Sequence, residues 1–139
     1  MEGSNSLDRI SKPKELSEKE KELLTLSKVG HRTQSIYFKG KRIGKISLRE
    51  SGGGNSQSIY EVEIEPGYRN RGIGKEVYRR VNQELNKKGM VLTSEIGGIT
   101  STEANHMWES LVRSGEAEVV TDFLTERGVP VRYKFKDPK

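Results

Sequence analysis

The sequence contains no cysteine and only two histidines, His31 and His106, among its 139 residues. The absence of cysteine excludes disulfides, thiolate nucleophiles and cysteine-ligated metal sites. The two histidines are far apart in the sequence and lie outside any HExxH pattern, which disfavours a histidine-based metal site. We therefore expect a protein that binds no metal.

Long apolar runs are also absent. A signal peptide needs an apolar stretch of about 7–15 residues and a membrane span needs about 20. The polar first 14 residues contain no such stretch, and neither does the rest of the chain. The expected location is the cytoplasm, without a membrane partner.

The charge balance is basic, with a net charge of +5, and charged residues make up 32% of the chain. A basic balance can serve a nucleic acid, an acidic membrane surface or a small anionic ligand. Basic and acidic residues interleave along most of this sequence, which weakens the case for nucleic acid. A basic nucleic-acid-binding module therefore remains only a weaker alternative.

Residues 1–30 differ from the rest because they are rich in Lys, Glu and Ser and have no aromatic residue. Ser17 and Glu20 have the spacing of a capping box. The leucines that follow are Leu23, Leu24 and Leu26. This pattern predicts a short amphipathic helix over 17–27, preceded by disordered chain. We therefore divide the sequence into a polar extension, 1–30, and one folded domain, 31–139.

From Ser35 onward the pattern predicts a mixed α/β fold. Strands are expected at 35–38, 43–49, 58–65, 90–96, 116–120 and 129–135, and helices at 74–87 and 100–114. A glycine-rich connection is expected at 51–56 and a helical turn at 122–127. The order predicts a sheet with hairpins at its ends and a helical crossover between two neighbouring parallel strands.

The clearest strand, 58–65, has a strict alternation. Tyr60, Val62 and Ile64 should share one face, and Glu61 and Glu63 should lie on the other. The helix that follows carries apolar residues every four positions, which predicts a single buried stripe.

The junction between that strand and helix reads EIEPGYRNRGIG. Helix N-termini carry unpaired N–H groups and a partial positive charge. Glycines without Cβ atoms let a phosphate reach those N–H groups. Arg69 and Arg71 add fixed positive charge, so the junction predicts a phosphate-binding turn.

Three phosphate motifs compete for this turn. A Walker A loop fails because Ile73 stands where lysine is required. The dinucleotide fingerprint fails because Val77 replaces its third glycine. The pattern Arg-x-x-Gly-x-Gly fits fully, with Arg69, Gly72 and Gly74.

With the upstream Val62-x-Ile64-x-Pro66 and the downstream amphipathic helix, this segment resembles the central motif of the GNAT acetyltransferase superfamily. The resemblance extends over about 35–135. It implies a central mixed β-sheet flanked by helices, with acetyl-CoA as the acyl donor. The implied pyrophosphate-binding residues are Arg69, Asn70, Arg71, Gly72, Ile73 and Gly74.

The resemblance implies further cofactor contacts. The strand carrying Val62 and Ile64 should splay from its parallel neighbour, so that its backbone pairs with the pantetheine arm. Asn105, early in the second helix, matches an asparagine that contacts the cofactor in the family. The structural alternative for Asn105 is a solvent-facing helix residue.

The sequence departs from the family late in the second helix. Many members carry a tyrosine there that protonates the departing thiolate, but this chain has Leu111 and Val112. Three tyrosines remain as substitutes: Tyr133, Tyr60 and Tyr78. Tyr78 is the weakest of them, because its helix should face away from the cleft.

Glu61 and Glu63 are the candidates for the base that deprotonates the amine, since they lie beside the expected acetyl position. The function implied is an N-acetyltransferase acting on a small-molecule amine, a protein lysine or a protein N-terminus. The alternative is a non-catalytic acyl-CoA-binding regulatory domain, which the missing tyrosine supports. The acceptor and the oligomeric state stay open.

Overall fold

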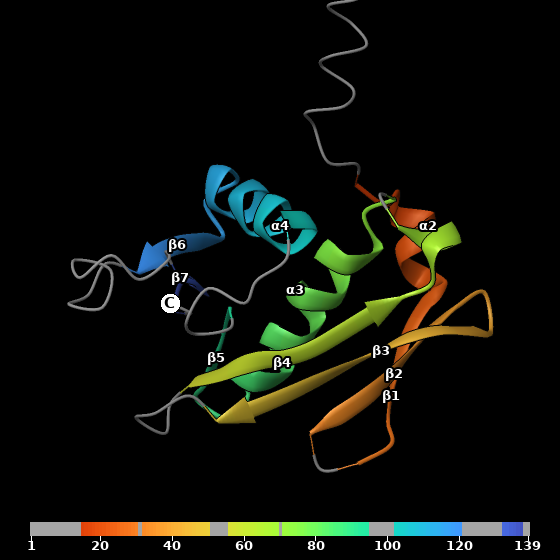
Figure 1. Ribbon diagram of the computed structural model, residues 1–139, viewed down its shortest axis with the longest axis horizontal. Coiled ribbons are helices and arrows are strands. Elements are labelled where there is room, and N and C mark those ends of the chain that lie inside the picture. The colour runs from red at the N-terminus through yellow and green to blue at the C-terminus, as the bar shows by residue number, and fades with distance from the viewer. Residues whose placement is uncertain are drawn as a thin grey trace, which may run out of the picture.

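The computed structural model describes residues 15–30, 32–50, 56–69, 71–94, 102–120 and 132–137 (Figure 1). The elements in chain order are α2 (Glu18–Glu22), β1 (Leu24–Lys28), β2 (Thr33–Phe38), β3 (Lys41–Glu50), β4 (Ser56–Ile64), η1 (Pro66–Tyr68), α3 (Ile73–Asn86), β5 (Val91–Thr93), α4 (Thr102–Arg113), β6 (Ala117–Val120) and β7 (Arg132–Phe135). The expected connection at 51–56, the turn at 122–127 and the start of the last strand lie wholly or partly outside these residues.

The described strands form one seven-stranded sheet in the order β1-β2-β3-β4-β5-β7-β6. β1 to β4 are antiparallel neighbours, β4 and β5 are parallel, and β7 lies between β5 and β6. The helix α3 makes the crossover between β4 and β5. The mixed α/β fold and its central crossover are therefore confirmed.

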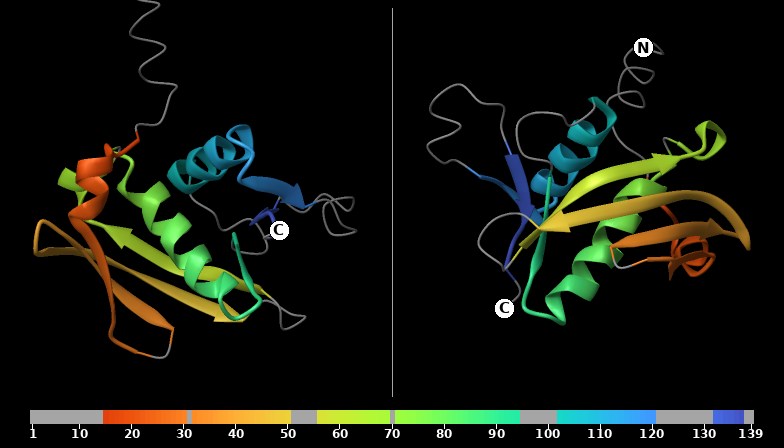
Figure 2. Two further views of the ribbon diagram at one scale, coloured as in Figure 1. Left: turned by 180° about the vertical axis from the view of Figure 1, so that it is seen from behind. Right: turned by 60° about the horizontal axis from the view of Figure 1, so that its bottom comes forward.

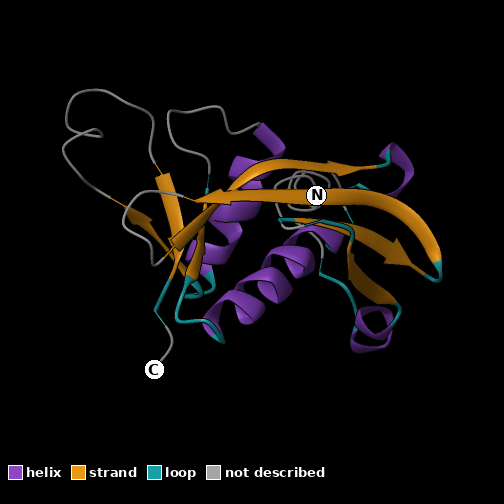
Figure 3. Ribbon diagram, turned by 90° about the horizontal axis from the view of Figure 1, so that it is seen from below, coloured by secondary structure: helices purple, strands orange, loops and turns teal. Residues whose placement is uncertain are grey.

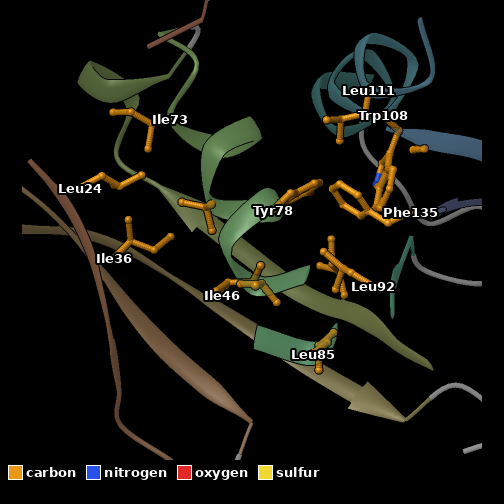
Figure 4. Packing of buried hydrophobic residues seen from close by; sticks show 14 of the residues in the cluster. Leu24, Ile36, Ile46, Ile73, Tyr78, Leu85, Leu92, Trp108, Leu111 and Phe135 are labelled. Atoms are coloured by element: carbon orange, nitrogen blue, oxygen red, sulfur yellow. The ribbon is translucent and has the colours of Figure 1, made fainter. Parts of the chain in front are cut away.

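The two long helices lie side by side on the sheet, with α3 across the strands β1 to β4 and α4 against β6 (Figure 2). Seen from below, the long, curved β3 and β4 run together above α3 (Figure 3). The predicted apolar stripe of α3 is buried, and its members are Ile73, Val77, Val81 and Leu85. The stripe packs onto sheet residues such as Ile36 and Ile46 (Figure 4).

The C-terminal part of the core is aromatic. Trp108 of α4 is fully buried and contacts the rings of Tyr78, Tyr133 and Phe135. Aromatic side chains bury large apolar areas, so this cluster joins α3, α4 and β7. Trp108 therefore has a structural position in the core.

The prediction of a helix over 17–27 is wrong beyond residue 22. The capping box forms at Ser17 and Glu20, but α2 ends after five residues. Leu24 and Leu26 then alternate with exposed residues in β1, which pairs with β2. Burial of these leucines under α3 selects the strand, because alternate residues of a strand share one face.

In the described part of the chain, no helix is long and apolar enough to cross a membrane.

Candidate functional site

A β-bulge divides β4 into two halves. Leu48 of β3 pairs with Ile59, whereas its neighbour Ser47 pairs with Glu61, so Tyr60 is an extra residue in β4. Ile59 is buried and Tyr60 is 59% exposed. The prediction that Tyr60 shares a face with Val62 is therefore wrong, because the bulge shifts the alternation by one residue.

The two halves differ in their strand partners. The proximal half, residues 56–59, pairs with β3 and, through residues 56–58, also with β5. The distal half, residues 61–64, pairs with β3, and β5 gives it no partner within the described residues. Its backbone N–H and C=O groups on the β5 side can therefore pair with an extended ligand.

Val62 and Ile64 in the distal half pack against the core. Glu61 and Glu63 alternate with them and lie on the opposite face of the sheet. Glu61 is 3.5 Å from the ammonium group of Lys45, and Glu63 makes no ion pair with any described residue. The structure therefore places both carboxylates on one face of the distal half, opposite Val62 and Ile64.

Gly44 of β3 is a residue that sequence reasoning missed. A Cβ atom at this position would lie 1.9 Å from the carbonyl oxygen of Glu63, which is backbone and cannot move aside. Only glycine lets β3 approach the distal half this closely. An isolated glycine inside a strand pattern was the available signal, since it indicates a bulge or a close backbone approach.

The basic turn follows the distal half directly. Pro66–Tyr68 form the short helix η1, and the guanidinium Nε of Arg69 donates to the carbonyl oxygen of Ile64 at 2.8 Å. Gly72 is the N-cap of α3 with φ of +89°, a conformation that favours glycine. It supplies no side-chain cap, so the first N–H groups of α3 stay available to an anion. Asn70 lies outside the described residues.

Three basic side chains beside this turn make cation–π contacts with two aromatic rings, those of Phe38 and Tyr68. The guanidinium of Arg71 lies 5.4 Å from the ring centre of Phe38 and 5.3 Å from that of Tyr68. The ammonium groups of Lys39 and Lys41 lie 5.6 Å and 5.5 Å from the same two rings, respectively. These cation–π contacts hold Arg71 close to the helix N-terminus, where a phosphate would be attracted.

The last two predicted members of the turn face the protein interior. The side chain of Ile73 is buried in the core, so only its backbone can contact a ligand. Gly74 is also buried, and a Cβ atom there would lie 2.6 Å from the sulfur of Met107 in α4. The glycine at 74 therefore sets the approach of α4 to α3.

An ion-pair network joins the same two helices and was not predicted. The buried ammonium of Lys75 donates to Ser110 Oγ of α4 at 2.7 Å and also to Glu15. Arg79 binds Glu15 at 3.0 Å and Glu116 at 2.7 Å. Hydrogen bonds from Arg79, aided by Lys75, lower the pKa of Glu15 to about 2.

Asn105 is half-buried on α4, two residues before the methionine that contacts Gly74. The structure thus places its helix next to the turn, and no described contact joins Asn105 itself to the turn. Leu111 and Val112, which lie where a tyrosine was expected from the resemblance, are buried and half-buried in the core, respectively.

The three tyrosines have different surroundings. Tyr78 is buried in the core, and burial raises the pKa of its phenol. Tyr60 is exposed on the bulge, with the guanidinium of Arg49 5.5 Å from its ring centre. Tyr133 lies on β7 beside the end of β5. The described residues contain no cluster of three metal-ligating side chains, and His106 is exposed on α4.

The chain matches the family model of the acetyltransferase (GNAT) family over residues 5–111. No curated protein sequence matches it significantly. Among solved structures, an IAA acetyltransferase from Bacillus cereus matches with a TM-score of 0.53 and 17% identity, over 74% of this chain and 75% of its own.

Two further structures contain the cofactor. A Bacillus anthracis protein provisionally assigned as a streptothricin acetyltransferase, in complex with acetyl coenzyme A, matches with a TM-score of 0.53 and 18% identity over 80% of this chain. The PaiA N-acetyltransferase of Thermoplasma acidophilum, in complex with coenzyme A, matches with a TM-score of 0.51 and 19% identity over 75% of this chain. The chain spans 65% and 59% of the lengths of these two proteins. At these identities the similarity shows the fold.

Proposed function

The chain belongs to the acetyltransferase (GNAT) family, and from that premise we propose that it transfers the acetyl group of acetyl-CoA to an amine. The observation that carries the proposal is the junction of β4 and α3. There a strand half that has no second strand partner among the described residues leads into a basic turn and a helix N-terminus without a side-chain cap. The acceptor is a small-molecule amine, a protein lysine or a protein N-terminus.

The cofactor would bind along this junction. The N–H groups at the start of α3 and the charges of Arg69 and Arg71 would hold its pyrophosphate, with Asn70 and Gly72 in the same turn. Ile73 and Gly74 would contribute backbone groups only. The pantetheine arm would pair with the backbone at Val62 and Ile64, and Asn105 would contact it from α4.

Acetyl transfer then requires a neutral amine. Glu61 or Glu63 would take its proton, directly or through water, because both carboxylates lie on the free half of β4. A backbone N–H of the same strand half would polarise the thioester carbonyl. The amine nitrogen forms the new C–N bond, the C–S bond breaks, and coenzyme A leaves as the thiol.

Cofactor binding can be tested by calorimetry with Arg69→Ala and Arg71→Ala. Charge-assisted contacts contribute about 1.5–3 kcal/mol, so each substitution should weaken acetyl-CoA binding by about 10- to 100-fold. Arg113→Ala, an exposed arginine at the end of α4, is the matched control and should bind normally. Unchanged affinity in both turn variants would refute the proposed site.

Substitutions of Gly74 are a poor test of phosphate binding. Even the Cβ atom of alanine would lie 2.6 Å from the sulfur of Met107, so lost binding would report the displaced α4. The arginine variants change charge without filling that space.

A second candidate function is acyl-CoA binding without turnover. It is favoured by Leu111 and Val112, which have no proton to give in the region where many family members carry a tyrosine. Release of free coenzyme A from acetyl-CoA across a panel of amines separates the two functions. A binding domain would retain acetyl-CoA affinity and release none.

A further inference from the structure

A pocket lies at the C-terminal end of α3, away from the basic turn. Its apolar wall is formed by Val81 and Leu85 of α3, Leu48 of β3, and Met90, which precedes β5. Ile73, beside the turn, and Leu85 lie at the two ends of the buried stripe of α3 (Figure 4). At a rise of about 1.5 Å per residue, the helix between them spans roughly 18 Å. The pocket is therefore separate from the junction proposed to bind acetyl-CoA.

The sheet side of this pocket is polar at positions where the core would otherwise continue. Gln34 lies two residues before the buried Ile36 in β2, and Gln57 lies two residues before the buried Ile59 in β4. Alternate residues of a strand share one face, so both glutamines lie on the core face of the sheet, and both line the pocket. The pocket thus has hydrogen-bonding groups on one side and the apolar stripe of α3 on the other.

Three cationic side chains line the same pocket, namely Lys28 at the end of β1, Arg32 in the connection to β2, and Lys88 after α3. Glu84 is the acidic residue among the lining residues, and its carboxylate pairs with Lys87, outside the lining, at 3.0 Å. Positive charge therefore exceeds negative charge around the pocket, which favours an anionic ligand.

Arg32 has an unpaired donor that points to such a ligand. Its Nε atom is buried and has no hydrogen-bond partner among the described residues. Its Nη2 atom lies 3.6 Å from a carboxylate oxygen of Glu50, so that ion pair leaves Nε unused. Buried donors are almost always satisfied by protein, by water or by a ligand, because an unpaired one is unfavourable. An acceptor held in the pocket would satisfy this donor.

We propose that the pocket binds a small carboxylate that carries a short apolar chain. The carboxylate would accept a hydrogen bond from Arg32 Nε and lie near the charges of Lys28 and Lys88, while the chain would pack on Leu85 and Met90. This binding is independent of the acetyl transfer proposed above.

The size of the pocket limits the length of that chain. Its volume of about 90 Å³ exceeds the space that one water needs, about 10–15 Å³. It is well below the roughly 300–1,000 Å³ of pockets for drug-sized ligands. The volume therefore favours a short-chain acid over a nucleotide or a long-chain lipid.

The first test adds hexanoate to the full chain and follows the methionine methyl groups by NMR. The chain has three methionines, and carbon-13 labelling of their methyl groups gives one resonance for each. The Met90 resonance is identified by its absence in Met90→Leu. Hexanoate should shift this resonance and leave that of Met107, which lies beside Gly74, unchanged. An unmoved Met90 resonance, or a shift at Met107 in its place, would overturn the proposal.

The second test separates the charge of the ligand from its chain. Hexan-1-ol keeps the chain and lacks the carboxylate, so it should bind the wild type at least about 10-fold more weakly than hexanoate. From acetate to hexanoate, each added methylene should tighten binding by up to about fourfold until the pocket is full. Equal affinities for hexanol and hexanoate would show apolar adsorption and contradict the proposed carboxylate site.

The third test removes the unpaired donor. Arg32→Met keeps a long side chain without N–H groups and should weaken hexanoate binding by about 10- to 100-fold. Arg113→Met changes an exposed arginine at the end of α4 and should bind hexanoate normally. The melting temperature of each variant shows whether it is folded, and the hexanol comparison decides the question if Arg32→Met is not. A folded Arg32→Met that binds hexanoate as tightly as the wild type would refute the assignment.

Discussion

The two halves of β4 belong to one strand and have different roles. The proximal half, residues 56–59, is paired with β3 and β5 and contributes the buried Ile59 to the core. The distal half, residues 61–64, has β3 as its strand partner and carries both candidate bases. The bulge at Tyr60 separates the two halves and shifts by one residue which side chains of the distal half face the core.

This difference shows how a sheet can present a strand segment that, among the described residues, is paired on one side alone. The proximal half is fixed by its neighbours on both sides, so it positions the distal half without covering it. The distal half is supported from one side by β3 and from below by α3. Its free side is then available for a ligand, and the basic turn begins where it ends.

The largest effect is expected from the carboxylates of the distal half. A lost general base lowers the rate by about 10²–10⁴-fold, so Glu61→Gln or Glu63→Gln should lower kcat by that order without weakening acetyl-CoA binding. Activity should partly recover at higher pH, because more of the amine is then neutral. Steady-state kinetics over pH 6–9 measures both effects.

Glu118→Gln is the control for this substitution, because Glu118 lies on β6 and pairs with Lys134. It should retain full kcat. If Glu61→Gln, Glu63→Gln and the double variant all keep full kcat across the range, the distal half carries no base. The amine would then lose its proton to water.

The next largest effect is a loss of stability when the close approach of β3 to the distal half is disturbed. Gly44→Ala forces a methyl group against the carbonyl of Glu63, and overpacking of this kind lowers the free energy of unfolding by about 3 kcal/mol. Gly67→Ala, where a Cβ atom meets nothing within 4 Å, should change it little. Urea denaturation compares the two, and equal stabilities would show that β3 tolerates a wider spacing.

A smaller effect on the melting temperature is expected from removing the N-terminal segment that packs against α3, the helix that follows the distal half. A chain beginning at Lys14 keeps Glu15 and the buried Leu16, and its melting temperature should stay within a few degrees of the full chain. A chain beginning at Ser17 loses both residues, and burial of a leucine contributes about 2 kcal/mol. Thermal unfolding should therefore separate the two truncations. A large fall in the melting temperature of the chain that begins at Lys14 would show that the residues before it also stabilise the fold.

The smallest expected effect is a pH dependence of the free energy of unfolding that comes from Glu15. Its pKa is lowered from 4.5 to about 2, so its stabilising contribution is complete above pH 4.5 and is lost as the pH falls toward 2. The side chain is half-exposed, so solvent screening keeps the contribution below about 1 kcal/mol. Denaturation curves between pH 5 and pH 2.5 should fall more steeply for the wild type than for Glu15→Gln. Parallel curves would exclude a role for this carboxylate.

Much of the fold was predictable from the sequence, because its signals are local. The stripe on α3, the alternation in the distal half and the glycines Gly89 and Gly115, both with positive φ after a helix, each act within a few residues. The leucines before residue 28 were assigned to the wrong element. Their spacing fits a helix or a strand, and only their burial under α3 decides between the two.

The candidate site was predictable where it depends on backbone chemistry. The turn from Arg69 to Gly72 could be recognised because positive charge and a glycine precede a helix. Tertiary contacts could not be predicted from the sequence in the same way. The space that Gly74 leaves for Met107, and the link of Lys75 to Ser110, depend on how α4 approaches α3, which no local pattern specifies.

The contacts of Arg79 have a consequence for the order of folding. Arg79 binds Glu116, which is 37 residues away in the sequence, and Glu15, which is 64 residues away. Both partners of Glu15, Lys75 and Arg79, lie on α3, so the N-terminal segment can dock only after that helix has formed. Contacts made after the transition state slow unfolding and leave the folding rate unchanged. If the contacts of Glu15 form after the transition state, its loss should shorten the lifetime of the native state without delaying its formation.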